Sequence, residues 1–178
     1  MFRIKTVSDA EANGTVKEVY QGMKDSLGMV PNVFQALSLW PEMLESYAAM
    51  FDKVMFSNTR LTRAVKEMIA STVSKVNSCD YCLGHHKYFM TQYGISSPVS
   101  EQIVSDPQTA EITDAEKRIL AYVEKMTRHA YKVTDADVEG LKKVGWTDAQ
   151  ILEATLVSAL FNSVNRFADA LGVEPEAG

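Results

Sequence analysis

The chain has 178 residues, of which 46% are hydrophobic and 23% charged, a balance typical of a globular protein with a substantial buried core. A net charge of −5 leaves no basic stripe to neutralise phosphates, which argues against a nucleic-acid-binding protein. No apolar run is long enough for a membrane span, and residues 1–6 lack the apolar stretch of a signal peptide, so we expect a cytoplasmic protein with no membrane partner.

Helix-start signals recur along the chain. In a capping box, a Ser or Thr hydroxyl accepts a hydrogen bond from an exposed helix N–H, and a Glu or Gln three residues later reaches back. Ser8 and Glu11 form the first such box, and further boxes begin at Thr113 and Thr147, with a weaker one at Thr134. We therefore expect a helix directly after each of these four residues.

Turn-forming residues separate the helical stretches, and no segment shows the sustained alternation of a β-strand. The fold class is therefore predicted to be all-α, with about eight helices joined by short loops. Because there is no low-complexity tract or linker, we expect a single domain over residues 1–178. The last helix, predicted at about 148–171, is apolar on most of its surface, which is typical of a helix in a core or an oligomer interface.

Residues 60–94 are predicted to form a helix, a tight connection and a second helix. On the first helix, Glu67 lies on a face of small residues that would let the second helix approach closely. Asn77 and Ser78 are favourable N-cap residues, so the second helix is expected to begin there and to run to Tyr93.

The only two cysteines of the chain, Cys79 and Cys82, would then stand on the first turn of the second helix. At this spacing their Cα atoms are about 5–6 Å apart, within the range of a disulfide. Exposed N–H groups and the helix dipole stabilise a thiolate at this end of a helix. His86 follows Cys82 by one turn and can take its proton, whereas His85 is rotated about 100° away.

This arrangement suits the reduction of a peroxide substrate. A thiolate attacks the O–O bond and becomes a sulfenic acid, and a neighbouring thiol condenses with it to form a disulfide. Cys82, with His86 one turn away, is the better candidate for the attacking thiol. Cys79 is the better candidate for the resolving thiol and for the target of an external dithiol reductant. Glu67 can orient or protonate His86.

The spacing of Glu67, Cys79-Asp80-Tyr81-Cys82 and His86 resembles the core signature of the alkyl hydroperoxidase D branch of the carboxymuconolactone decarboxylase-like family. The resemblance implies an all-helical fold, a homo-oligomer such as a trimer or hexamer, and a thiol-based hydroperoxidase. It also implies that Cys82 is the peroxidatic cysteine, Cys79 the resolving one, and Glu67 with His86 the proton relay.

Tyr81 departs from the best-known members of that family, which carry His at this position. Its hydroxyl can form hydrogen bonds, but a phenol is a poor proton shuttle at neutral pH. Tyr81 is therefore a candidate to line the site or to pack beside it.

Three other interpretations of the cysteine pair stay open. A zinc ion could use Cys79, Cys82, His85 and His86, although the only other histidine is His129 and structural zinc sites usually draw ligands from a second element. A thiol–disulfide oxidoreductase or a non-enzymatic redox sensor would use the same pair. Because further ligands are scarce, a closed zinc site is hard to complete and we expect no functional metal. No Gly-rich phosphate loop is present and nothing resembles a flavin or nicotinamide site, so we expect no organic cofactor.

Overall fold

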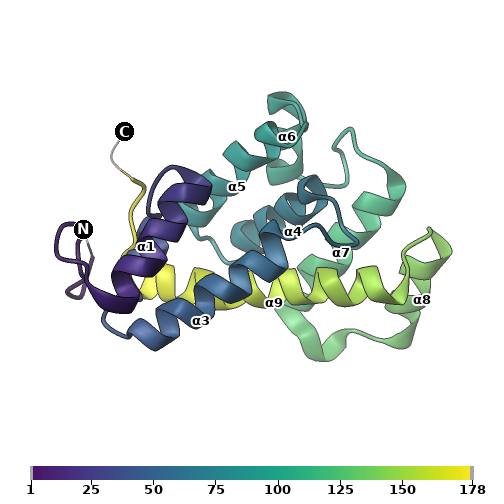
Figure 1. Cartoon of the computed structure of the whole chain (residues 1–178). Helices are drawn as coiled ribbons and strands as arrows, with labels where there is room; N and C mark the ends of the chain where they lie inside the picture. The colour runs from purple at the N-terminus through teal and green to yellow at the C-terminus, as the bar shows by residue number, and fades with distance from the viewer. Residues whose placement is uncertain (1, 177–178) are drawn as a thin grey trace. The chain divides into compact units, whose positions relative to one another are not determined.

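The computed structural model describes residues 2–176, and within these residues all regular secondary structure is helical, without a strand (Figure 1). Eight α-helices of the described part of the chain have nine residues or more, and the all-α prediction with about eight helices is confirmed. The elements are α1 (Gly14–Leu27), the short α2 (Asn32–Gln35), α3 (Pro41–Phe51), a π-helical turn (Asp52–Phe56), α4 (Arg63–Val76), α5 (Asp80–Gln92), α6 (Ser97–Ser105), α7 (Asp114–His129), a 3-10 turn (Ala130–Lys132), α8 (Asp135–Lys143) and α9 (Asp148–Leu171).

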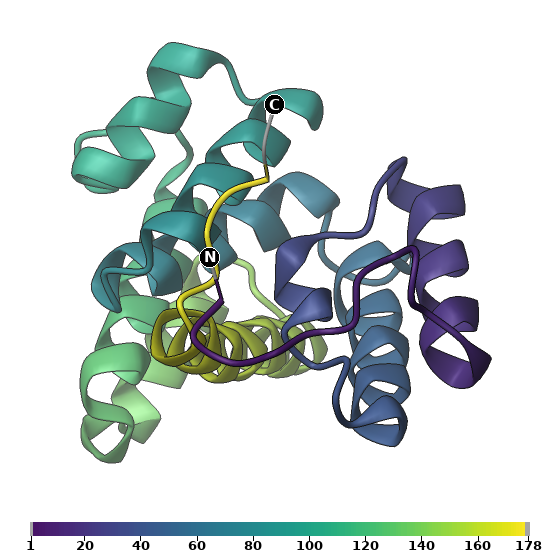
Figure 2. The ribbon, with the colours of Figure 1, turned by 90° about the vertical axis from the view of Figure 1, so that its left-hand side faces the viewer.

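The described residues form two compact units, one of residues 2–56 with 167–176 and one of residues 57–166. In the first unit the segment around Arg3 lies beside the end of α9, because the Arg3 N–H donates to the Leu171 carbonyl over 2.8 Å (Figure 2). Also in this unit, the Tyr20 hydroxyl donates to the Val7 carbonyl over 2.9 Å. The expectation of one domain over residues 1–178 stays a prediction.

Helix α4 forms the centre of the second unit. It begins after Thr62, whose hydroxyl accepts from the Val65 N–H, and ten consecutive residues from Val65 to Ser74 are buried. Helices α5, α6 and α7 pack on it. A helix that is buried on all sides needs partners for its polar groups, and α4 contains Lys66 and Glu67.

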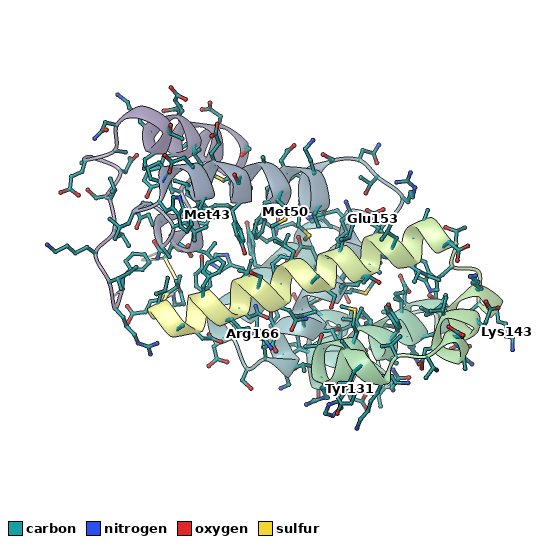
Figure 3. The ribbon with its side chains drawn as sticks, turned by 90° about the horizontal axis from the view of Figure 1, so that it is seen from below. Met43, Met50, Tyr131, Lys143, Glu153 and Arg166 are labelled. Carbon is teal, nitrogen blue, oxygen red and sulfur yellow. The ribbon has the colours of Figure 1, made fainter. Side chains whose placement is uncertain are left out.

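Lys66 is paired with Glu153 on α9. The Lys66 side chain is 1% exposed, and its Nζ lies 3.2 Å from Glu153 Oε1 and 3.2 Å from the Ser57 carbonyl oxygen. Glu153, near the start of α9 (Figure 3), also accepts from the Arg60 N–H over 3.1 Å. These contacts fix the segment before α4 to α9, and so they position the first turn of α4.

Helix α9 was expected at about 148–171, and it begins and ends there. Its inward residues include Ile151, Ala154, Val157 and Val164, whereas Leu152 and Leu156 on the opposite side are 60% and 50% exposed. No helix among residues 2–176, α9 included, combines the length and the hydrophobicity that crossing a membrane requires.

Three of the four predicted helix starts are confirmed, because capping boxes begin at Thr113, Thr134 and Thr147. The predicted helix start directly after Ser8 is wrong. The Ser8 N–H does donate to Glu11 Oε2 over 3.2 Å, but these residues close a single turn and α1 begins only at Gly14. Ala12 and Asn13 intervene, and Asn13 has an extended conformation (φ −142°, ψ 170°) as the N-cap residue of α1, so the turn does not continue as a helix.

Candidate active site

The connection between α4 and α5 places the two cysteines. Helix α4 ends in a Schellman motif, in which the Cys79 N–H donates to the Ser74 carbonyl over 3.0 Å and the Ser78 N–H donates to the Lys75 carbonyl over 3.1 Å. Ser78 has a φ of 59°, the left-handed conformation that this motif requires and that glycine usually supplies. Ser78 is therefore the last residue of the α4 cap, and Asn77 and Ser78 do not cap α5 as expected from the sequence.

The left-handed backbone conformation of Ser78 is expected to be strained, and the strain can be measured. A non-glycine residue in the left-handed region costs on the order of 1 kcal/mol, of which the greater flexibility of glycine in the unfolded chain offsets a part. We expect Ser78→Gly to raise the free energy of unfolding by about 0.5–1 kcal/mol in urea denaturation. Ser26→Gly, inside α1, is the matched control and should lower it by about 0.5 kcal/mol. An unchanged or lower stability of Ser78→Gly would contradict the assignment of strain.

Cys79 is the N-cap residue of α5 and Cys82 lies in its first turn. Cys79 is 0% exposed and Cys82 3% exposed, and no disulfide joins them in the structure. The Cys79 carbonyl accepts from the Leu83 N–H over 2.9 Å, the first bond of the helix. The expectation that both cysteines lie within the first turn is thus correct for Cys82, whereas Cys79 lies one position outside the helix.

Glu67 and His86 meet between α4 and α5. Glu67 Oε2 lies 2.7 Å from His86 Nδ1, and the exposed fractions of the two side chains are 1% and 7%. His86 follows Cys82 by four residues on α5, so it lies on the same helix face as Cys82, one turn further along the helix. The close approach of the two helices that the sequence predicted is present, and it brings together the carboxylate and the imidazole.

The carboxylate of Glu67 is held in its charged form. Burial raises the pKa of this carboxyl, but the hydrogen bond and charge of His86 and the charge and hydrogen bond of Arg63 together lower it more. The pKa of Glu67 therefore lies below its ordinary value. An ionised carboxylate only accepts hydrogen bonds, so His86 must carry its proton on Nδ1 when neutral, and its Nε2 is then a base.

Phe161 of α9 packs edge-on against the His86 ring, with centroids 4.4 Å apart and planes at 90°. Together with the Glu67 bond, this contact fixes the plane of the imidazole. Tyr81 is 7% exposed, and its ring lies 4.6 Å from that of His85, which is partly exposed. Tyr81 and His85 thus contact each other beside the cysteines.

Arg63, the first residue of α4, is a site residue that was not predicted from the sequence. Its Nε lies 2.6 Å from Glu67 Oε1, and its side chain is 15% exposed. The four-residue spacing of Arg63 and Glu67 was a usable signal, because residues at this spacing are neighbours on a helix. That signal is weak, since most such pairs lie on a solvated surface.

A zinc site formed by the cysteines and histidines was another possible interpretation of the sequence. Such a site needs at least three His, Cys, Asp or Glu side chains that converge on one point. Within residues 2–176 no group of three or more of these side chains is arranged to hold a metal ion.

Comparisons with known proteins agree with this fold. The model of the carboxymuconolactone decarboxylase family matches residues 41–125. A solved peroxidase-related protein from Silicibacter sp. TM1040 is 31% identical, with 99% of this chain and 96% of that one covered and a TM-score of 0.87. The alkylhydroperoxidase AhpD core of a peroxidase-related protein from Ralstonia eutropha JMP134 is 27% identical, with coverages of 98% and 92% and a TM-score of 0.91.

A more distant structure shares the fold alone. It is the debrominase Bmp8, solved in complex with 2,3,4-tribromopyrrole, and it is 19% identical, with coverages of 98% and 92% and a TM-score of 0.84. A search of curated proteins gave no match.

Proposed function

Because this chain belongs to the carboxymuconolactone decarboxylase family, among its alkylhydroperoxidase D-like members, we propose that it is a thiol-dependent peroxidase. Its substrate is an organic hydroperoxide or hydrogen peroxide, Cys82 is the attacking thiol and Cys79 the resolving one. The observation that carries the proposal is the buried contact of 2.7 Å between Glu67 and His86, one helical turn from Cys82.

In the first step His86 takes the proton of the Cys82 thiol, and the thiolate attacks the terminal oxygen of the hydroperoxide. The S–O bond forms as the O–O bond breaks, so that Cys82 becomes a sulfenic acid and the alkoxide leaves. The alkoxide receives the proton that His86 holds. Glu67 supports both transfers, because an ionised carboxylate at Nδ1 stabilises the imidazolium while the proton is on the ring.

In the second step the Cys79 thiol attacks the sulfenic sulfur of Cys82. A Cys79–Cys82 disulfide forms and water leaves, which carries away the oxygen and both protons. The short separation of an N-cap residue and a residue in the first turn favours this reaction. An external dithiol then returns two electrons and two protons to regenerate both thiols.

Recycling needs a movement of the connection between α4 and α5. Cys79 is fully buried, so an external dithiol reaches it only when this connection opens. The connection contains one residue in a strained conformation, Ser78, and this strain favours a local opening there.

The proposal includes a cytoplasmic homo-oligomer, a trimer, hexamer or related assembly. The exposed leucines of α9 support it, because Leu152 and Leu156 are one turn apart on the same face of the helix and would be covered by a second subunit.

The test is a titration of the reduced protein with cumene hydroperoxide, followed by stopped-flow fluorescence and intact-mass spectrometry. We expect the loss of two hydrogens, 2 Da, as the intramolecular disulfide forms, at a rate at least about 100-fold above that of a free thiol. Oxidation at the rate of a free thiol would reject the peroxidase. Fast reduction of a model disulfide would then favour a thiol–disulfide oxidoreductase. Stoichiometric oxidation with a change in oligomeric state and no turnover would favour a redox sensor.

A further inference from the structure

Both carboxylate oxygens of Glu67 have a hydrogen-bond partner, and only one of them, Oε2, contacts His86. The second, Oε1, lies 2.6 Å from Arg63 Nε, one turn earlier on α4. The carboxylate thus bridges an arginine that is always charged and a histidine that exchanges a proton. Nothing in the peroxidase proposal above uses this arginine.

The Arg63 guanidinium is itself fixed by the helix that carries the cysteines. It lies over the ring of Phe89, 5.6 Å from its centroid, and over that of Tyr93, 4.8 Å away. Phe89 belongs to α5 and Tyr93 is the C-cap residue of that helix. Contacts of a guanidinium with aromatic faces are favourable and directional, so the two rings hold the fork of Arg63 against Glu67.

The charges explain why the arginine is needed. With His86 neutral, the Glu67 carboxylate alone would leave one negative charge in the interior, at a cost that favours its protonation. Arg63 balances that charge without a proton, and His86 can then be neutral beside an ionised Glu67. We propose that Arg63 is a positioning residue that keeps Glu67 ionised and turned toward His86, and so sets the pH range in which Cys82 reacts.

The direction of the pH effect follows from the groups that act on Glu67. Among the described residues, His86 from α5 and Arg63 from α4 lower the pKa of this carboxyl, and burial raises it. Without Arg63 the pKa of Glu67 rises, so Glu67 becomes protonated at a higher pH. A neutral Glu67 no longer stabilises the imidazolium of His86 beside the Cys82 thiolate, so the fall of Cys82 reactivity at low pH, the acid limb of the profile, should begin at a higher pH.

The experiment measures the rate of Cys82 alkylation by iodoacetamide against pH, with mass spectrometry to identify the site, beside kcat/KM for cumene hydroperoxide. Arg63→Met is expected to move the acid limb of both profiles up by about one pH unit, which is on the order of a tenfold loss of rate on that limb. Arg63→Lys keeps the charge and should restore the position of the limb. Arg128→Met removes the exposed Arg128–Glu124 pair of α7, also at four-residue spacing, and should change nothing.

A double variant tests whether Arg63 acts through Glu67. In a Glu67→Gln background, Arg63→Met should add no further shift, because the two residues then no longer interact. An unmoved limb in Arg63→Met, or an equal shift in the Glu67→Gln background, would overturn the inference. Should Arg63→Met fail to fold, Arg63→Gln removes the charge and keeps a hydrogen-bond donor, and the same outcomes apply.

The consequence for peroxide reduction rests on the proposed function, but the alkylation readout does not. If no variant reduces peroxide and the alkylation limb still moves in Arg63→Met alone, the peroxidase is rejected and the assignment of Arg63 stands. If peroxide reduction is fast and the limb does not move, the peroxidase stands and Arg63 has only a structural contact.

Discussion

Replacing Cys82 by serine is expected to abolish peroxide reduction, with kcat/KM for cumene hydroperoxide at least about 1,000-fold below that of the unmodified chain. A serine hydroxyl has nearly the shape of a thiol but is not ionised at neutral pH, so no nucleophile is left to attack the O–O bond. The residue is buried in the first turn of α5, and a substitution of similar size should preserve the packing. Stopped-flow measurement of the first turnover gives the rate directly.

Cys79→Ser is the matched control, because it makes the same chemical change three residues earlier. Its first turnover should stay within a few-fold of the unmodified rate and stop at a sulfenic acid on Cys82, which dimedone traps for mass spectrometry. Steady-state turnover should be lost. If Cys79→Ser rather than Cys82→Ser abolishes the first turnover, the roles of the two cysteines are reversed.

Replacing Glu67 by glutamine is the second change with a large expected effect. The amide keeps the size of the side chain but cannot stabilise an imidazolium, and its N–H groups can displace the Nδ1 proton of His86 as the donor in this contact. We expect kcat/KM to fall by about 100-fold or more, the usual contribution of a positioned proton-transfer group. A pH profile between pH 5 and 9, with circular dichroism at each pH, separates this loss from unfolding.

Glu153→Gln is a control for the loss of a buried ion pair. Glu153 is bonded to the 1%-exposed Lys66, and its pKa is lowered, since the hydrogen bonds of Thr59, Lys66 and Arg60 outweigh the effect of burial. Its replacement should lower the free energy of unfolding in urea and leave kcat/KM unchanged. A loss of rate equal to that of Glu67→Gln would mean that packing, and not proton transfer, explains the effect at Glu67.

Some parts of the site could be predicted from the sequence more fully than others. Cys82 and His86 lie within one helix, so their relative placement follows from 3.6 residues per turn once the helix is recognised. Cys79 is the N-cap residue just before that helix, and its non-helical backbone conformation does not follow from the spacing. The placement of Glu67 opposite His86 needed one further inference, that small residues on α4 let α5 approach. The structure places the two side chains in contact, while the catalytic roles of all four residues stay predictions.

The ends of helices were less well predicted. The boxes at Thr113, Thr134 and Thr147 start helices, whereas the turn at Ser8 ends before Asn13, whose extended conformation makes it the N-cap residue of α1. At the α4–α5 connection, Ser78 is of a residue type favoured at helix N-caps, but it has the left-handed conformation found just after a helix C-terminus. A serine is compatible with both, and the packing of α5 against α4 decides between them.

The sequence by itself determined the all-α class, the position of α9 and the helix that carries the cysteine pair, because each depends on residues within a few turns of one another. Only the tertiary structure decided that α4 is buried on all sides, that Lys66 pairs with Glu153, and that Arg63 bridges Glu67 to the rings of Phe89 and Tyr93. These features join residues on different helices. The free energy of a buried charge depends on which groups surround it, and that set is fixed only when the helices have packed.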